Sequence, residues 1–255
     1  MISQALDALP GGVLSIFLVL CRIGGCLMVL PAIGGARVPV RVRLMVCLAI
    51  SVAVAFALGN FESARESLSS TPSLVSLVLI ETAKGLVIGI MVRFFFASLK
   101  FLAVAGSAAL GLAMPVNAVE EDGETTPPLA EFVSLTAAFL FLATDQHLEV
   151  LKALLQSYTV LPVGTGIGLA PSLSGVVDTL RDACLVSLQV VAPLLVFAFL
   201  VNLLFGVLNR IAPQTPAYFL SMPFVIGGGM LIFYFIAGEM FLLFMGAFAS
   251  WLREI

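Results

Sequence analysis

The segment Thr215–Ser250 is 36 residues long and carries a single charged residue, Glu239. As one straight helix it would measure roughly 54 Å, whereas the hydrocarbon core of a bilayer is about 30 Å thick. Hydrocarbon offers no hydrogen-bond partner to backbone groups, so such a segment in a membrane has to be helical. The sequence therefore predicts a helix that breaks, tilts or extends beyond the lipid, with Pro216, Pro223 and Gly227–Gly229 as its break points.

The rest of the chain has the same apolar character. Of its 255 residues, 61% are apolar and 11% are charged, against roughly half and a quarter in a soluble domain. The net charge is −3, and no cluster of four or more lysines and arginines flanks an apolar run, which argues against a nucleic-acid partner. We predict an all-α integral membrane protein that forms one domain over residues 1–255.

Further apolar runs predict further helices, and together they give five to seven hydrophobic elements. The positive-inside rule places the basic segments 37–43 and 93–100 on one side of the membrane, but Arg210 agrees only if a segment of the second half re-enters. The number of true spans is therefore left open. The runs are Gly11–Ile33, Leu44–Leu58, Ser73–Val92, Leu129–Tyr158 and Val176–Leu208.

Charged residues inside the apolar runs are candidate functional residues, because a charge in hydrocarbon has to pair, face a cavity or line a pathway. Glu81 and Lys84 are three residues apart and share one helix face, where they can neutralise each other. They form either a local ion pair that allows the helix to insert or a contact to another subunit. Arg22 and Glu239 have no partner nearby in the sequence, and we expect their side chains to extend to a boundary.

Small residues form two further features. Gly85 and Gly89 form a G-x-x-x-G pattern, which allows two helix backbones to approach closely. A second small-residue surface leads directly into an acidic segment, and this arrangement suits either close helix packing or a constriction in a conduit. Its candidate plug or gate residues are Gly106, Ser107, Ala108, Ala109, Gly111, Met114, Pro115, Asn117, Glu120, Glu121 and Asp122.

No pattern in the chain indicates catalysis or a cofactor. Asp145, His147 and Glu149 are spaced i, i+2 and i+4, which scatters them around a helix and argues against a metal site. His147 is the only histidine, so no Ser–His or Cys–His pair exists elsewhere. The four cysteines lie in apolar runs without metal-type spacing. We predict a protein that is not an enzyme and has no metal or other cofactor.

Three longer patterns resemble one known family. They are CRIGGCLMVLPAIGGARVPVRVRL near the N-terminus, ATDQHLEVLKALLQSYTVLPVG in the middle and NRIAPQTPAYFLSMPF in the second half. In this order they resemble the FliR family, the flagellar type III export-gate proteins, whose injectisome counterpart is SctT. Two positions depart from the family pattern: Gln146 replaces a glycine, and Thr215–Pro216 replaces the common Leu-Asn.

The resemblance implies a fold of helical hairpins, similar to FliP-like and FliQ-like units joined in one chain. It implies a core subunit of the flagellar export gate in the bacterial inner membrane and flagellar basal body, where it helps form a closed channel for unfolded flagellar proteins. The implied partners are FliP-like and FliQ-like subunits, an FlhB-like export switch protein and the unfolded substrates. The alternatives are a secondary transporter for a small solute, the injectisome equivalent or a purely structural membrane scaffold.

The resemblance also divides the chain and assigns roles to residues. It implies a first half over about 1–116, a plug-like loop over about 106–126 with weak, displaceable packing, and a second half over about 127–255. The polar stretch Asn209–Pro223 would be a break between two helices packed on protein. The predicted subunit contacts are Glu81, Lys84, Gly85, Gly89, Asn209, Arg210, Pro213 and Gln214.

Overall fold

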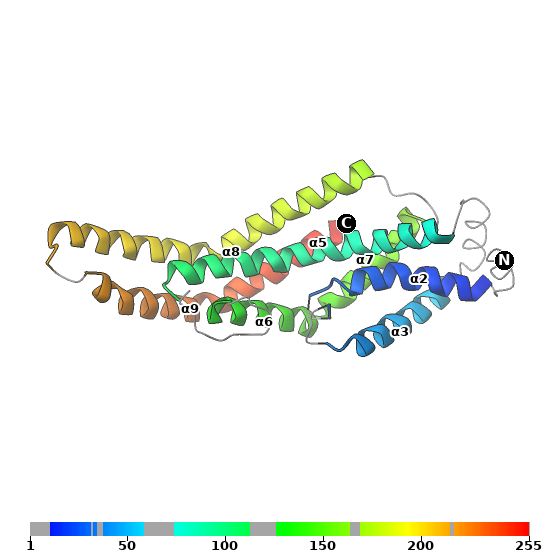
Figure 1. The fold of residues 1–255 in the computed structure, drawn as a ribbon, viewed down its shortest axis with the longest axis horizontal. Helices are drawn as coiled ribbons and strands as arrows, with labels where there is room; N and C mark the ends of the chain where they lie inside the picture. The colour runs from blue at the N-terminus through cyan, green and yellow to red at the C-terminus, as the bar shows by residue number, and fades with distance from the viewer. Residues whose placement is uncertain are drawn as a thin grey trace. The chain divides into compact units, whose positions relative to one another are not determined.

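The computed structural model describes residues 11–31, 33–34, 38–58, 74–112, 126–163, 169–214 and 217–254. These residues form seven α-helices and no strand (Figure 1), which confirms the predicted all-α fold. The helices are α2 (Gly11–Leu27), α3 (Val40–Leu58), α5 (Leu74–Ala109), α6 (Pro128–Ala143), α7 (Gln146–Val160), α8 (Leu169–Ile211) and α9 (Ala217–Glu254).

Four of these helices, α3, α5, α8 and α9, are long and apolar enough to cross a membrane. A fifth span results if the consecutive helices α6 and α7 count as one. The described helices therefore agree with a membrane protein, and α5, α8 and α9 are each longer than a bilayer core requires, at 36, 43 and 38 residues.

The segment Leu129–Tyr158, predicted as one helix, is interrupted at Thr144–Asp145. Asp145 adopts a left-handed conformation with φ 56° and ψ 19°, which an α-helix does not contain. The Thr144 amide and its hydroxyl both bond to the Leu140 carbonyl, which closes the end of α6. Aspartate tolerates this backbone region better than most residues, but apolar periodicity does not reveal such a joint.

In α9 the sequence predicts break points at Pro223 and Gly227–Gly229. This prediction is wrong, because the helix continues through all of these residues. Two of the three glycines serve packing. A Cβ at Gly228 would lie 2.5 Å from the ring of Phe197, and one at Gly229 would overlap the side chain of Leu110. The predicted break is instead confined to residues 212–216, between the end of α8 and the start of α9.

The chain forms two compact units, and each draws on both halves of the sequence. Unit 1 contains Met1–Phe94 and Asp145–Thr179 with the last residue, and unit 2 contains Phe95–Thr144 and Leu180–Glu254. The helices α5 and α8 contribute a portion to each unit. The predicted single domain over residues 1–255 stays a prediction.

Unit 1 is built around α2. The helix α3 packs on it through Cys47, Ser51 and Ala55, which are buried at four-residue intervals on one face of α3. Leu18 of α2 and Leu77 of α5 form a small buried cluster on which Leu74, Val78 and Val163 also pack. Small residues on the buried face of α3 let its backbone lie close to α2.

Unit 2 has an aromatic core from α5, α6 and α9. The ring of Phe95 lies 4.6 Å from that of Trp251 and 5.5 Å from that of Phe248, centroid to centroid. Phe96 joins Phe141 of α6 at 5.4 Å in an edge-to-face contact. Such pairs contribute about 0.5–1.5 kcal/mol each beyond their burial, so this core fixes the portion of α5 that leads to Ala109.

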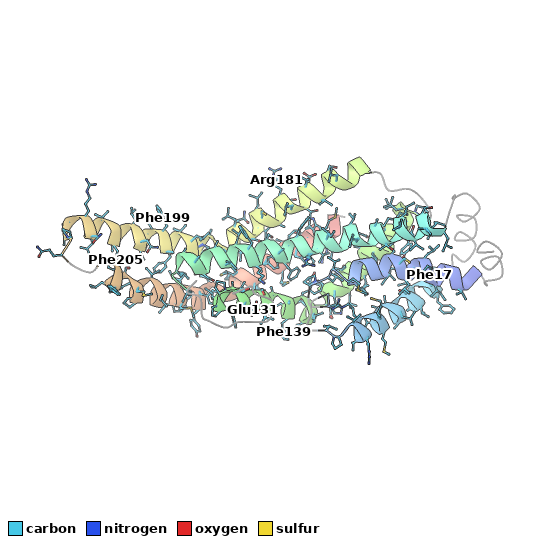
Figure 2. The ribbon with its side chains drawn as sticks, viewed as in Figure 1. Phe17, Glu131, Phe139, Arg181, Phe199 and Phe205 are labelled. Atoms are coloured by element: carbon cyan, nitrogen blue, oxygen red, sulfur yellow. The ribbon has the colours of Figure 1, made fainter. Side chains whose placement is uncertain are left out.

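Large apolar side chains also cover much of the outer surface of the helices. Figure 2 labels three of them, Phe17 of α2, Phe139 of α6 and Phe199 of α8, and the last two are 68% and 64% exposed. In unit 2, α8 and α9 run antiparallel on either side of the break at 212–216 (Figure 1), with Phe205 packed near Phe224. Exposed apolar faces of this extent mark contact with lipid or with other proteins.

Candidate functional site

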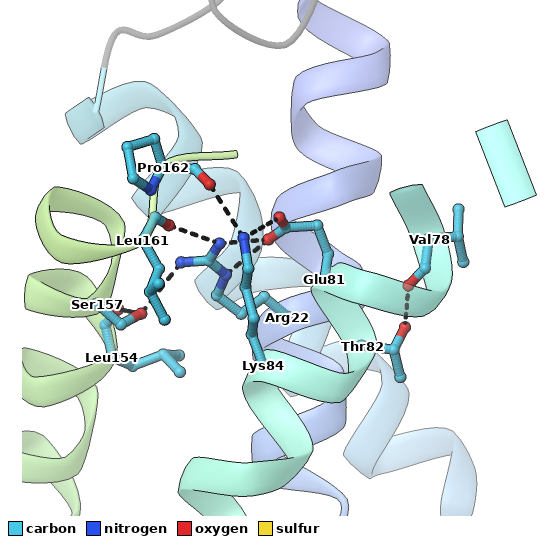
Figure 3. Close-up of polar contacts among 9 residues, drawn as sticks. All are labelled: Arg22, Val78, Glu81, Thr82, Lys84, Leu154, Ser157, Leu161 and Pro162. Atoms are coloured by element: carbon cyan, nitrogen blue, oxygen red, sulfur yellow. Dashed lines mark hydrogen bonds and ion pairs between the residues drawn. The ribbon is translucent and has the colours of Figure 1, made fainter. Parts of the chain in front are cut away.

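Arg22 of α2 is a fully buried charged side chain of unit 1, with none of its surface exposed. Its Nε donates to a carboxylate oxygen of Glu81 on α5 at 2.7 Å. Its two terminal nitrogens donate to the hydroxyl of Ser157 on α7 at 3.2 Å and to the Leu161 carbonyl at 3.0 Å (Figure 3). The expectation that Arg22 extends to a boundary is therefore wrong, because two other helices of its own chain, α5 and α7, supply its partners.

Lys84 completes the arrangement from the same face of α5 as Glu81. Its Nζ lies 2.9 Å from the other Glu81 oxygen and donates to the Pro162 carbonyl at 3.0 Å. Glu81 is fully buried and Lys84 is 3% exposed. The predicted pairing of Glu81 with Lys84 is confirmed, and we name the group Arg22, Glu81, Lys84, Ser157 and the carbonyls of Leu161 and Pro162 the buried charge cluster.

Tyr158 of α7 closes the cluster on one side. The guanidinium carbon of Arg22 lies 4.0 Å from the centroid of the Tyr158 ring, a cation–π distance. The Tyr158 hydroxyl is buried and has no hydrogen-bond partner within the described part of the chain. The ring, and not the hydroxyl, is therefore what Tyr158 contributes to Arg22.

Glycines allow α2 and α5 to bring these side chains together. A Cβ at Gly85 would overlap the Arg22 carbonyl oxygen, and one at Gly89 would lie 2.7 Å from that of Cys26. On the facing helix, a Cβ at Gly25 would lie 2.6 Å from the Thr82 carbonyl oxygen. The close approach predicted from the G-x-x-x-G pattern is confirmed, and its partner is α2 of the same chain.

The charges of the cluster do not balance by themselves. Two cations face one carboxylate, and the excess positive charge meets the carbonyls at the carboxyl end of α7, where a helix carries partial negative charge equivalent to roughly half an elementary charge. A buried ion group of this kind is strongly destabilised when one partner is removed. Its geometry suits joining three helices in a fixed register.

The small-residue surface at the end of α5 is packed closely in unit 2. Gly106 and Ser107 are buried, Ala108 and Gly111 are exposed, and Ala109 is intermediate. A Cβ at Gly106 would lie 3.0 Å from a Val191 methyl carbon. At this position the glycine admits a neighbouring helix, and the weak packing predicted for the plug-like loop stays a prediction.

Gly111 ends α5 in a well-defined cap. The amides of Leu112 and Gly111 donate to the carbonyls of Ser107 and Ala108 at 2.9 and 3.0 Å, the two bonds of a Schellman motif. Gly111 has a φ of +73°, which favours glycine. A plug role stays a prediction for these residues, and Met114, Pro115, Asn117, Glu120, Glu121 and Asp122 lie outside the described residues.

The remaining predicted subunit contacts lie at the break between α8 and α9. Asn209, Arg210, Pro213 and Gln214 are all exposed, so their side chains are available to a partner. Glu81, Lys84, Gly85 and Gly89 instead have contacts within unit 1. A single chain does not test contacts to other subunits, and all eight assignments stay predictions.

The D-x-H-x-E segment is divided by the joint before α7. Asp145 is the left-handed residue, His147 lies in the first turn, and Glu149 pairs with Lys152 at 2.6 Å on the exposed face. Among the described residues, no group of three or more His, Cys, Asp or Glu side chains is placed to hold a metal ion.

A sequence profile described as "Bacterial export proteins, family 1" matches residues 13–251. The chain belongs to this family. The match to the bacterial export proteins covers nearly the whole chain and includes every member of the buried charge cluster. The buried charge cluster therefore lies within the region that matches the family profile.

Individual proteins named FliR are also similar to the chain over most of its length. The flagellar biosynthetic protein FliR of Caulobacter vibrioides is 29% identical over 208 residues, which cover 81% of each chain. FliR of Escherichia coli strain K12 is 25% identical over 83% of this chain and 79% of its own length, and FliR of Aquifex aeolicus is 24% identical over 83% and 80%. The FliR resemblance predicted from the sequence is confirmed.

Proposed function

We propose that the chain is a subunit of the flagellar protein export apparatus in the bacterial inner membrane. It acts there without catalysing a reaction and helps to enclose a channel for unfolded flagellar proteins. The observation that carries the proposal is the bacterial export profile over residues 13–251, together with relatives that are named flagellar biosynthetic protein FliR. The four helices with membrane-spanning length and composition support a membrane location.

The proposed partners are FliP-like and FliQ-like subunits, with an FlhB-like export switch protein nearby. Support comes from the outer surface of the helices. Within the chain, only 22% of an 18-residue apolar stretch inside Leu173–Ile211 of α8 is buried, and only 28% of an 18-residue apolar stretch inside Phe219–Arg253 of α9. Helices that pack on partner subunits remain apolar on several faces and still accommodate prolines such as Pro193 and Pro223.

Co-purification tests the proposal directly. The tagged chain is co-expressed with the FliP-like and FliQ-like proteins of the same bacterium and extracted in a mild detergent. We expect a stable complex that contains all three chains. A chain that purifies only as a monomer or homo-oligomer, and that transports a small solute after reconstitution, would instead identify a secondary transporter.

A further inference from the structure

The helices of unit 1 are joined in two different ways. The contact between α2 and α5 is made by backbone atoms, because Gly25, Gly85 and Gly89 each face a carbonyl oxygen of the other helix. Buried apolar residues such as Leu18 and Leu77 add to it. The Arg22–Glu81 ion pair also joins these two helices, so the α2–α5 contact does not depend on α7.

The helix α7 is held through side chains. Its buried residues are Val150, Ala153, Leu154 and Tyr158, and its carboxyl end is held by Arg22 and Lys84. On its outer face the side chain of Lys152 is 66% exposed and paired to Glu149. The helix begins at the left-handed Asp145, whose side chain makes no cap hydrogen bond. Arg22 and Lys84 thus hold the helix at its carboxyl end.

The same cations bond to both neighbours. Within the described α2–α5 pair, Arg22 and Lys84 both face the carboxylate of Glu81. Docking of α7 supplies the Leu161 and Pro162 carbonyls to the excess charge. Undocking would break these two bonds and leave the glycine contacts of α2 and α5 in place.

We propose that α7 is a releasable latch: the Arg22 and Lys84 cations hold its carboxyl end, and weakening that hold undocks α7 while α2 and α5 stay together. The device allows the end of α7 to change position over an intact α2–α5 core. The inference goes beyond the proposed export function and is tested on the chain itself.

The test uses thiols at three places in the full-length chain in mild detergent. Ala153→Cys reports on the buried face of α7, the native Cys26 is buried beside Gly89 and reports on the α2–α5 contact, and the native Cys184 is exposed. Maleimide labelling of each thiol is followed separately by peptide mass spectrometry. In the parent protein, Cys184 should label quickly, while Cys26 and the thiol at position 153 stay protected.

Lys84→Met should raise labelling at position 153 by at least about tenfold, which corresponds to about 1.4 kcal/mol, while Cys26 stays protected. Lys84→Arg should restore protection because it keeps the charge. Lys152→Met is the matched control, since it removes the lysine of an exposed i, i+3 pair on the same unit and should change nothing.

Two outcomes would overturn the latch. In the first, position 153 stays protected in Lys84→Met, so the cluster does not hold α7. In the second, Cys26 becomes labelled together with position 153, so the cluster supports the whole unit. Ser157→Ala provides a milder variant that keeps all three charges and removes only one Arg22 contact. It should give a smaller rise at position 153 with Cys26 protected, and the absence of any rise would also count against the proposal.

Discussion

Arg22 draws its partners from residues that lie 59, 135 and 139 positions away in the sequence. A guanidinium presents five donors in a planar fork, which allows one side chain to bond to a carboxylate, a hydroxyl and a carbonyl at once. Replacing such a group by apolar residues is often neutral for stability, whereas leaving one member unpaired is costly. At the residue scale, Arg22 therefore brings the Glu81 carboxylate, the Ser157 hydroxyl and the Leu161 carbonyl together.

Tyr158 gives a prediction that separates its ring from its hydroxyl. Tyr158→Phe keeps the ring over Arg22 and removes a buried hydroxyl that has no partner in the described residues. We expect the free energy of unfolding to stay the same or to rise by up to about 1 kcal/mol. Tyr158→Leu should lower it by about 1–2 kcal/mol through loss of the cation–π contact. Unfolding titrations in mixed micelles measure both, and a destabilising Tyr158→Phe would mean that the hydroxyl has a partner.

At the scale of helices, glycine decides where backbones approach. Gly24 and Gly25 are adjacent in α2, yet only a Cβ at Gly25 would meet the facing helix. The same principle places Phe197 and Leu110 against the glycines of α9. Glycine costs about 1 kcal/mol in a helix interior relative to alanine, and here the close contact offsets that cost.

Gly85→Ala should weaken the α2–α5 contact, because its Cβ would overlap the Arg22 carbonyl oxygen. We expect a loss of about 1–3 kcal/mol, as is usual for overpacked sites, visible as a lower midpoint in thermal unfolding in detergent. Gly24→Ala is the matched control, since nothing lies within 4 Å of its Cβ position and alanine favours the helix. Equal midpoints for the two variants would show that the close approach is not needed.

At the scale of the whole molecule, two arginines of the α8–α9 region lie at helix ends. Arg210 lies in the last turn of α8 and Arg253 in the last turn of α9, and both are exposed. Each satisfies the partial negative charge at its helix end in the same way. The two arginines therefore form a matched pair for a test of the predicted subunit contact at the break between α8 and α9.

Arg210→Ala should lower the yield of complex with FliP-like and FliQ-like chains, because Arg210 lies at the polar break that we propose as a subunit contact. Arg253→Ala is the matched control and should leave the yield unchanged. Quantitative pull-downs with equal expression of each variant measure the effect. A normal yield for Arg210→Ala would count against this contact.

Several features were predictable because they depend on local chemistry. Glu81 and Lys84 share a helix face by spacing alone, and the G-x-x-x-G pattern predicts close backbone approach to some helix. The left-handed joint at Asp145 and the continuity of α9 through Pro223 were not predictable from apolar runs. Both residues are exposed, and the apolar pattern on either side of them is alike whether the helix continues or stops.

Taken by itself, the sequence determined that this protein is helical and lies in a membrane, because hydrocarbon requires each apolar segment to satisfy its own backbone hydrogen bonds. It also determined the family, since the motifs that carry the resemblance are read along the chain. Only the tertiary structure decided that Arg22 is paired and that α2 packs against the glycines of α5. It also decided that carbonyls at the carboxyl end of α7 accept hydrogen bonds from Arg22 and Lys84. These contacts join residues that are distant in sequence, and no local propensity encodes which of the compatible partners a buried charge will meet.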